Sequence, residues 1–175
     1  MNYVIIGLGN PGEEYALTRH NVGKEIVEYL MTTEPKKAKC YLSTEFMNNS
    51  GKFVAKLIKS KRAAEGLVVI HDDLDLPIGT FKMSFDKGPG GHRGVASIIK
   101  AIKTQEFIRI RVGVSPTTLK GKLKKPSGEE AVIKFILGKF KPAELKIVNS
   151  LRKKIAEALG VLTKEGRGKA MSLQY

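Results

Sequence analysis

The chain has 175 residues, a length typical of one domain, and its 42% hydrophobic and 27% charged residues are the balance of a folded globular protein rather than of a disordered chain. Its 31 Lys and Arg residues outnumber its 17 Asp and Glu residues, and the formal net charge of +14 favours a polyanionic partner such as nucleic acid, although a lysine-rich solvated surface would have the same composition. The single cysteine, Cys40, excludes an internal disulfide, and we find neither an apolar run long enough to span a membrane nor the basic region of a signal peptide, so we expect a cytoplasmic protein.

Strand-like and helix-like patterns alternate along the chain, and this alternation predicts a single α/β layered domain over residues 1–175. The strands are short β-branched or alternating runs, and the helices repeat apolar residues at intervals of three and four. In chain order we predict a strand at 3–8, a helix from 13 to 31, a polar connection at 32–39, a helix at 51–61, a strand at 67–71, a turn at 75–79, a strand at 80–85, a helix at 95–102, a strand at 107–114 and a helix at 142–159. Pro142 stands in the first turn of the last helix, and Gly160 stands just past its expected end.

Two further segments are predicted to be loops with a function. Residues 88–94 contain four glycines, and residues 115–130 contain four lysines and two prolines without any periodicity. We expect the segment 115–130 to be a mobile basic loop, and the alternative is an ordinary surface loop.

The glycine pattern at residues 7–12 is a candidate cofactor-binding motif, because it matches the dinucleotide fingerprint G-x-G-x-x-G. Its context disfavours that function, because Pro11 constrains the segment and the acid expected further on, Glu34, falls in a polar connection rather than at the end of a strand. The glycines more readily permit a sharp turn that presents Asn10 at the carboxyl end of the first strand.

Two familiar kinds of catalytic site are also disfavoured. Ser50 has no G-x-S-x-G elbow around it, and residues 49–51 are instead typical of a helix N-cap. The histidines His20, His71 and His92 are widely separated in the sequence and no second cysteine is present, so we predict no metal site.

Small polar residues instead follow the predicted strands. Asn10 follows the first strand, Asp72 and Asp73 follow the strand at 67–71, His92 lies in the glycine-rich loop, and His20 precedes or lines the first helix. In an open α/β sheet the carboxyl ends of the strands line the ligand crevice. A histidine held by a carboxylate can take a proton from water, and asparagine amides can orient a substrate. Each residue also has a plain structural alternative, such as a turn capped by Asp72.

These residues lie in motifs that together resemble one family. The motifs occupy residues 7–12 with Tyr15, 18–23, 46–51, 71–79, 90–94, 109–114 and 135–140. In this order they closely resemble those of the bacterial-type peptidyl-tRNA hydrolases, and the resemblance reaches from residue 3 to about residue 160.

The resemblance implies a mixed, twisted β-sheet flanked by helices, and a monomer that needs no metal or cofactor. It implies hydrolysis of the ester between a peptide and the terminal ribose of tRNA, with the acceptor stem and terminal adenosine of peptidyl-tRNA as partner. His20 matches the family's catalytic base, and Asp72 matches the carboxylate that orients it. The residues at matching substrate-binding positions are Asn10, Tyr15, Met47, Asn48 and Arg93.

The chain departs from the family at several positions. Arg93 stands where many members have asparagine, and the segment between residues 31 and 40 is short enough that a pair of short strands is expected to be trimmed or lost. Arg111 matches a position that meets tRNA phosphates, whereas Ser84 stands at a position that is often lysine. We therefore expect Lys82 and Lys87 to supply the missing phosphate contact.

The alternative function is a non-catalytic RNA-binding relative of the same fold. Retention of Asn10, His20, Asn48 and Asp72 together favours the enzyme.

Overall fold

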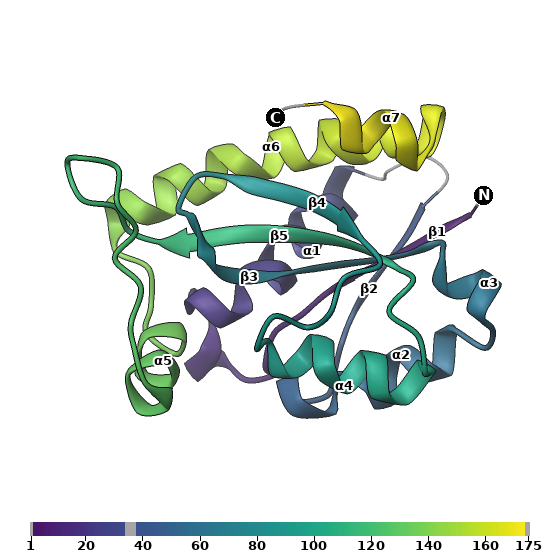
Figure 1. Ribbon diagram of the computed structural model, residues 1–175, viewed down its shortest axis with the longest axis horizontal. Coiled ribbons are helices and arrows are strands. Elements are labelled where there is room, and N and C mark those ends of the chain that lie inside the picture. The colour runs from purple at the N-terminus through teal and green to yellow at the C-terminus, as the bar shows by residue number, and fades with distance from the viewer. Residues whose placement is uncertain (1, 34–37, 174–175) are drawn as a thin grey trace.

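A five-stranded β-sheet lies at the centre of the structure, a computed structural model that describes residues 2–33 and 38–173 (Figure 1). The strands have the order β2-β1-β3-β5-β4. Their bounds are Tyr3–Gly7 for β1, Ala38–Leu42 for β2, Leu67–Pro77 for β3, Phe81–Phe85 for β4 and Ile108–Ser115 for β5. β1 pairs in parallel with β2 and β3, and β3 pairs in parallel with β5, whereas β4 is antiparallel to β5. The predicted mixed sheet is confirmed, and the carboxyl ends of the parallel strands share one edge.

Helices cover both faces of this sheet, as predicted (Figure 1). One face carries α1 (Val22–Thr33), α6 (Pro142–Glu165) and α7 (Arg167–Ser172), and the other carries α2 (Ser50–Leu57), α3 (Lys61–Ala64) and α4 (Arg93–Ile102). Each face has its own apolar core, with Ile26 of α1 and Ile155 of α6 in the first and Val54 of α2 and Ile98 of α4 in the second. No helix in the described part of the chain is long and apolar enough to span a membrane.

The helix predicted from residue 13 begins later, and the prediction of its start is wrong. Residues 13–21 instead form two short 3-10 turns, η1 (Glu13–Tyr15) and η2 (Arg19–Asn21). Between them Leu17 has a φ of 61°, a left-handed conformation that interrupts any right-handed helix. The turn η2 therefore places His20 before α1 rather than within it.

Strand β3 extends beyond its predicted end. It continues to Pro77 because it pairs with β5 through an irregular register between Asp73 and Pro77, and the turn predicted at 75–79 is reduced to residues 78–79. Gly113 of β5 is required there, since a Cβ on Gly113 would collide with the carbonyl oxygen of Pro77.

Two predicted helix ends also differ. Helix α2 ends at Leu57 because Ile58 is extended, and the separate helix α3 follows it with Ser60 as its N-cap. Helix α6 passes through Gly160 and ends at Glu165, because Leu159 and Leu162 are both buried in the core on either side of that glycine.

The predicted elements did not include β2, α7 or the helix that follows the basic loop. Strand β2 occupies part of the predicted connection 32–39, of which residues 34–37 lie outside the described residues, so at least one strand remains in the shortened segment. The loop 115–130 is pinched into a short hairpin by the bridge between Thr117 and Leu123, and its last residues begin helix α5 (Glu129–Ile136). The mobility of this loop stays a prediction.

Helix α1 approaches the carboxyl ends of β1 and β3 very closely. A Cβ on Gly23 would collide with the carbonyl oxygen of Ile70, and a Cβ on Gly7 would collide with the carbonyl oxygen of Gly23. Backbone bonds of 2.9 Å from Leu8 N to Ile70 O and 3.0 Å from Lys24 N to Leu8 O fix this contact. The turn η2, just before α1, is thereby held against the end of β3.

We predict that Gly23→Ala destabilises the protein by about 2–3 kcal/mol, because the new methyl group must push the helix away from the sheet. Urea unfolding would measure the change. Gly160→Ala is the matched control: a Cβ at Gly160 meets open space within a helix, so that variant should gain up to about 1 kcal/mol. Equal stability of the two variants would contradict this account of the contact.

Candidate active site

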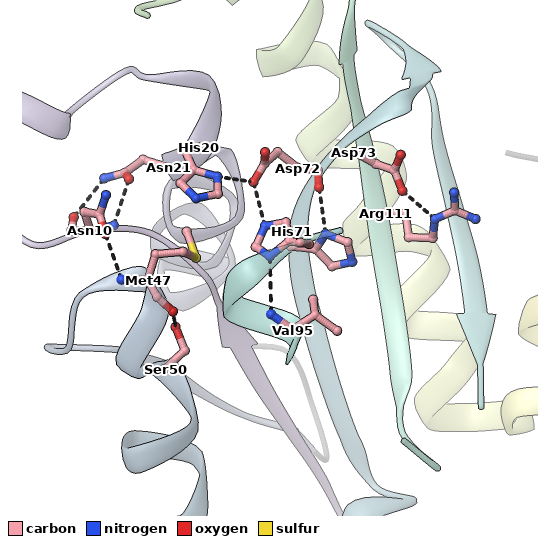
Figure 2. Close-up of polar contacts among 11 residues, drawn as sticks. Asn10, His20, Asn21, Met47, Ser50, His71, Asp72, Asp73, Val95 and Arg111 are labelled. Atoms are coloured by element: carbon pink, nitrogen blue, oxygen red, sulfur yellow. Dashed lines mark hydrogen bonds and ion pairs between the residues drawn. The ribbon is translucent and has the colours of Figure 1, made fainter. Parts of the chain in front are cut away.

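A histidine and an aspartate from distant parts of the sequence meet at the carboxyl edge of the sheet (Figure 2). His20 lies in η2, Asp72 lies in β3, and 2.9 Å separates His20 Nδ1 from Asp72 Oδ1. Both side chains are buried. The pairing of these two residues, expected from the resemblance, is therefore present in the fold.

A second histidine bonds to the same carboxylate oxygen. His92 Nε2 lies 2.9 Å from Asp72 Oδ1, while its Nδ1 accepts the backbone N–H of Val95 at 3.3 Å and so caps helix α4. The cap assigns the ring proton of His92 to Nε2, which donates to Asp72. In the neutral form of His20, donation to Asp72 through Nδ1 leaves Nε2 without a proton, so that Nε2 can act as a base.

The charge of Asp72 is secured by these two neighbours. Burial by itself would raise the pKa of Asp72, but the attraction of His20 and His92 and the hydrogen bonds from both rings outweigh it and hold that pKa well below its usual range. Asp72 therefore stays ionised and can stabilise a positive charge that forms on His20.

A third histidine packs behind this pair. His71 Nδ1 donates to the carbonyl oxygen of Asp72 at 2.7 Å, and its ring stands 4.6 Å from the ring of His92. Complete burial, followed by the proximity of His92, lowers the pKa of His71 well below its ordinary value. Its buried Nε2 has no partner among the described residues. His71 is thus a neutral side chain that supports the backbone of Asp72.

Asn10 is held in one orientation by the residues around it. Its Oδ1 accepts the Met47 N–H at 2.8 Å, and its backbone exchanges two hydrogen bonds, of 2.8 and 2.9 Å, with the side chain of Asn21. With Oδ1 occupied, the Nδ2 group of Asn10 is the part of the amide that can donate to a ligand.

These groups line a cleft of about 880 Å³. One wall comes from η3 (Met47–Asn49) and the preceding Phe46, and the other comes from the apolar residues of α5. Asn48 lines the cleft. Tyr15 lies behind Phe46, which lines the cleft, and the centroids of these two rings are 6.2 Å apart in an edge-to-face arrangement. Ser50 begins α2 as predicted, but its Oγ donates to the carbonyl of Met47 at 2.7 Å and no side-chain bond caps that helix.

Ion pairs surround the mouth of the cleft. Arg93 pairs with Glu129 of α5, and Lys125 pairs with Asp75 at 2.6 Å, so the segment 115–130 is tied to both α4 and β3. The exposed position of both pairs makes each of them weak.

Two of the basic residues predicted to meet phosphates, Arg111 and Lys82, lie close to this mouth. Arg111 Nε donates to Asp73 Oδ2 at 2.6 Å, and Lys82 of β4 stands directly opposite Arg111 in the register of the sheet. Lys87 is exposed on the loop between β4 and α4.

The wide spacing of the three histidines in the sequence did not indicate that they are neighbours, but the fold brings all three together. The ligand atoms of His20, Asp72 and His92 lie within 4.8 Å of one another, close enough to hold a metal ion. The hydrogen bonds do not suit one, however, since a metal on His92 Nε2 would move the ring proton to Nδ1, where it would face the N–H of Val95. The arrangement instead suits a carboxylate that accepts two N–H groups.

Sequence reasoning named His92 among the polar residues expected near the carboxyl ends of the strands but gave it no partner, and it did not single out Asn21. Their signals were local: His92 follows two glycines and directly precedes a helix, and Asn21 is adjacent to His20. Neither signal indicates the long-range partner, which in each case depends on how the chain returns to the edge of the sheet.

Comparison with known proteins gives consistent matches. A family model described as peptidyl-tRNA hydrolase matches residues 4–174. The chain is 37% identical to a peptidyl-tRNA hydrolase of Aquifex aeolicus, covering 89% of this chain and 87% of that protein, and 33% identical to one of Syntrophotalea carbinolica, covering 97% and 94%. The crystal structure of peptidyl-tRNA hydrolase from Acinetobacter baumannii superposes with a TM-score of 0.84 at 28% identity, covering 97% of this chain and 92% of that one.

We predict that His71 makes the protein less stable as the pH falls. In the unfolded chain a histidine binds a proton below about pH 6.5, whereas the folded protein keeps His71 neutral, so the free energy of unfolding should decrease below that pH. His71→Asn keeps a donor near the Asp72 carbonyl but cannot titrate. Urea unfolding between about pH 7 and about pH 5 should therefore give a flatter profile for the variant. Parallel profiles for the variant and the wild type would contradict the prediction.

Proposed function

The chain belongs to the peptidyl-tRNA hydrolase family, and from this membership we propose that it hydrolyses the ester bond between the peptide and the terminal ribose of peptidyl-tRNA. One observation carries the mechanism: His20 lines the cleft while its Nδ1 lies 2.9 Å from Asp72 Oδ1, which leaves Nε2 for a water molecule. A base in this position can activate water at neutral pH.

In the proposed reaction, His20 Nε2 takes a proton from water while the water oxygen attacks the ester carbonyl. Asp72 stabilises the resulting imidazolium through the bond to Nδ1. The bond between the carbonyl carbon and the ribose oxygen then breaks, and His20 returns the proton to that oxygen. The products are a free peptide acid and tRNA with its terminal hydroxyl restored.

Asn10 and Asn48 are proposed to hold the substrate beside His20. The amide of Asn10 has its oxygen bonded to Met47, which supports a role for Nδ2 as a donor to the scissile carbonyl as negative charge develops there. Arg93 can only donate, and we propose that it exchanges its exposed pair with Glu129 for a carbonyl or phosphate oxygen of the substrate. Met47 and Tyr15 are proposed to shape the same wall.

The tRNA part of the substrate is proposed to lie over the basic edge of the sheet. Lys82 and Arg111 stand opposite each other beside Asp73, close to the cleft, and are proposed with Lys87 to meet phosphates of the acceptor stem while the terminal adenosine enters the cleft. We also propose that the protein acts as a monomer, as the resemblance to the family implies. The substrate arises on ribosomes, so we place the activity in the cytoplasm.

We expect His20→Ala to lower the rate of hydrolysis by at least about 10²-fold, because the general base is lost. Release of the blocked amino acid from N-acetyl-aminoacyl-tRNA would measure the rate, and the affinity for the tRNA should stay near that of the wild type. A normal rate in this variant would exclude the mechanism. Absence of hydrolysis by the wild type itself, with tRNA binding intact, would favour the non-catalytic RNA-binding alternative.

Lys82→Met should weaken tRNA binding and make its salt dependence shallower, since each phosphate contact on a duplex contributes about 0.9 to the slope of log K against log salt. Lys39→Met is a suitable control, because Lys39 is likewise an exposed lysine at the second position of an edge strand, at the opposite edge of the sheet. Binding would be followed by fluorescence anisotropy at several salt concentrations. The same slope for both variants would place the tRNA elsewhere.

A further inference from the structure

The turn that carries His20 is joined to the segment that connects α5 with α6. Arg19 N donates to the carbonyl of Gly138 at 3.1 Å, and Phe140 N donates to the carbonyl of Leu17 at 2.9 Å. Thr18 and Lys139 pair as an antiparallel bridge between these bonds. The end of α5 is thus attached to the residues just before His20.

The side chain of Arg19 is the centre of this junction. Its Nη1 donates to the carbonyls of Gly138 and Lys139, both at 3.1 Å, and its Nη2 pairs with Glu144 of α6 at 2.8 Å. Its guanidinium also lies 4.4 Å from the ring centroid of Phe135 in α5. The side chain is only 8% exposed, so these charge-assisted bonds are well shielded from water. A planar group with several donors is needed to satisfy all of these partners at once.

Helix α5 has little buried surface of its own, so its attachments to the rest of the chain decide where it lies. None of its residues is buried. Val132, Ile133 and Ile136 line the cleft, whereas Phe135 is partly buried at the edge of a core, beside the Arg19 guanidinium. A helix without a buried face gains little from packing, so its position must come from its attachments. The exposed pair between Arg93 and Glu129 at its start is weak, which leaves the buried end near Arg19 as the firm one.

His20, in contrast, is held independently of Arg19. Its ring is bonded to Asp72, and the next residue, Asn21, exchanges hydrogen bonds with Asn10. The first turn of α1 then packs against the sheet through Gly23. Loss of the Arg19 side chain should therefore move α5 and leave the base in place.

We propose that Arg19 is a positioning residue for peptide binding: it sets the α5 wall of the cleft at a fixed place opposite His20, so that the wall can contact the peptide part of the substrate. This inference rests on the proposed function. Arg19 does not touch the reacting atoms, and its removal should weaken binding of the peptide while the hydrolytic step proceeds as before.

The test compares Arg19→Met and Arg19→Lys on two substrates, a tRNA bearing one N-acetylated amino acid and a tRNA bearing an N-acetylated tetrapeptide of apolar residues. Arg19→Met should raise KM for the tetrapeptide substrate about tenfold and leave kcat unchanged. A change of about tenfold corresponds to the loss of about one charge-assisted hydrogen bond, here one that holds the α5 wall in place. Arg19→Lys keeps the charge beside Glu144 and should raise KM less. KM for the short substrate should change little in either variant.

Arg167→Met is the matched control, because Arg167 also lies over a phenylalanine ring, that of Phe85, but in α7. It should leave both kinetic constants as in the wild type. If Arg19→Met does not fold, the smaller effect of Arg19→Lys decides, and melting temperatures identify this case. An unchanged KM in folded Arg19 variants, or a fall in kcat without a rise in KM, would overturn the proposal.

Amide hydrogen exchange gives a second readout that needs no activity. Residues 129–137 should exchange faster in Arg19→Met than in Arg167→Met, while the exchange of α1 stays the same in both. Equal exchange of residues 129–137 would overturn the role of Arg19 even if hydrolysis is normal. If the wild type does not hydrolyse either substrate, the proposed function fails while the exchange experiment still decides whether Arg19 positions α5.

Discussion

One carboxylate oxygen holds the site together. Oδ1 of Asp72 accepts an N–H from His20 and another from His92, and so joins η2, β3 and the start of α4 at a single atom. The tautomer of His92 is fixed, since its Nδ1 accepts the N–H of Val95. A buried carboxylate with two such donors remains charged, and that charge in turn fixes which nitrogen of His20 faces the cleft. Geometry and protonation are therefore set by the same contacts.

The backbone around this oxygen is arranged to make the meeting possible. Gly7 and Gly23 let α1 approach the ends of β1 and β3 more closely than any side chain would permit, and this approach presents η2 to Asp72. Gly113 has the same effect between β5 and the irregular end of β3. The ordinary cores on the two faces of the sheet support these contacts, while the polar groups are confined to one edge.

The sequence was sufficient for four of the five strands and for the pair of His20 and Asp72, because periodicity identifies buried strands and the family motifs name the two residues. It was insufficient where long-range contacts decide. Helix α5 lies next to a basic loop and has no buried face, so its first two residues were included in the loop prediction and residues 131–136 were assigned to no element. The end of β3 was predicted as a turn because Asp75 and Pro77 are typical turn residues, yet pairing with β5 keeps them in the strand. His92 was named as a candidate but was not paired with Asp72, because its approach to Asp72 depends on the path of the whole loop before α4.

The open sheet also bears on how copies of this chain avoid one another. Its two edge strands, β2 and β4, leave backbone groups that could pair with a strand of another molecule. Both are only five residues long, and each carries an outward lysine, Lys39 in β2 and Lys82 in β4. Short strands with a charged residue are a common protection against aggregation through sheet edges. Lys82 is therefore under two constraints at once, and replacing it with an apolar residue removes protection from one edge of the sheet as well as a positive charge.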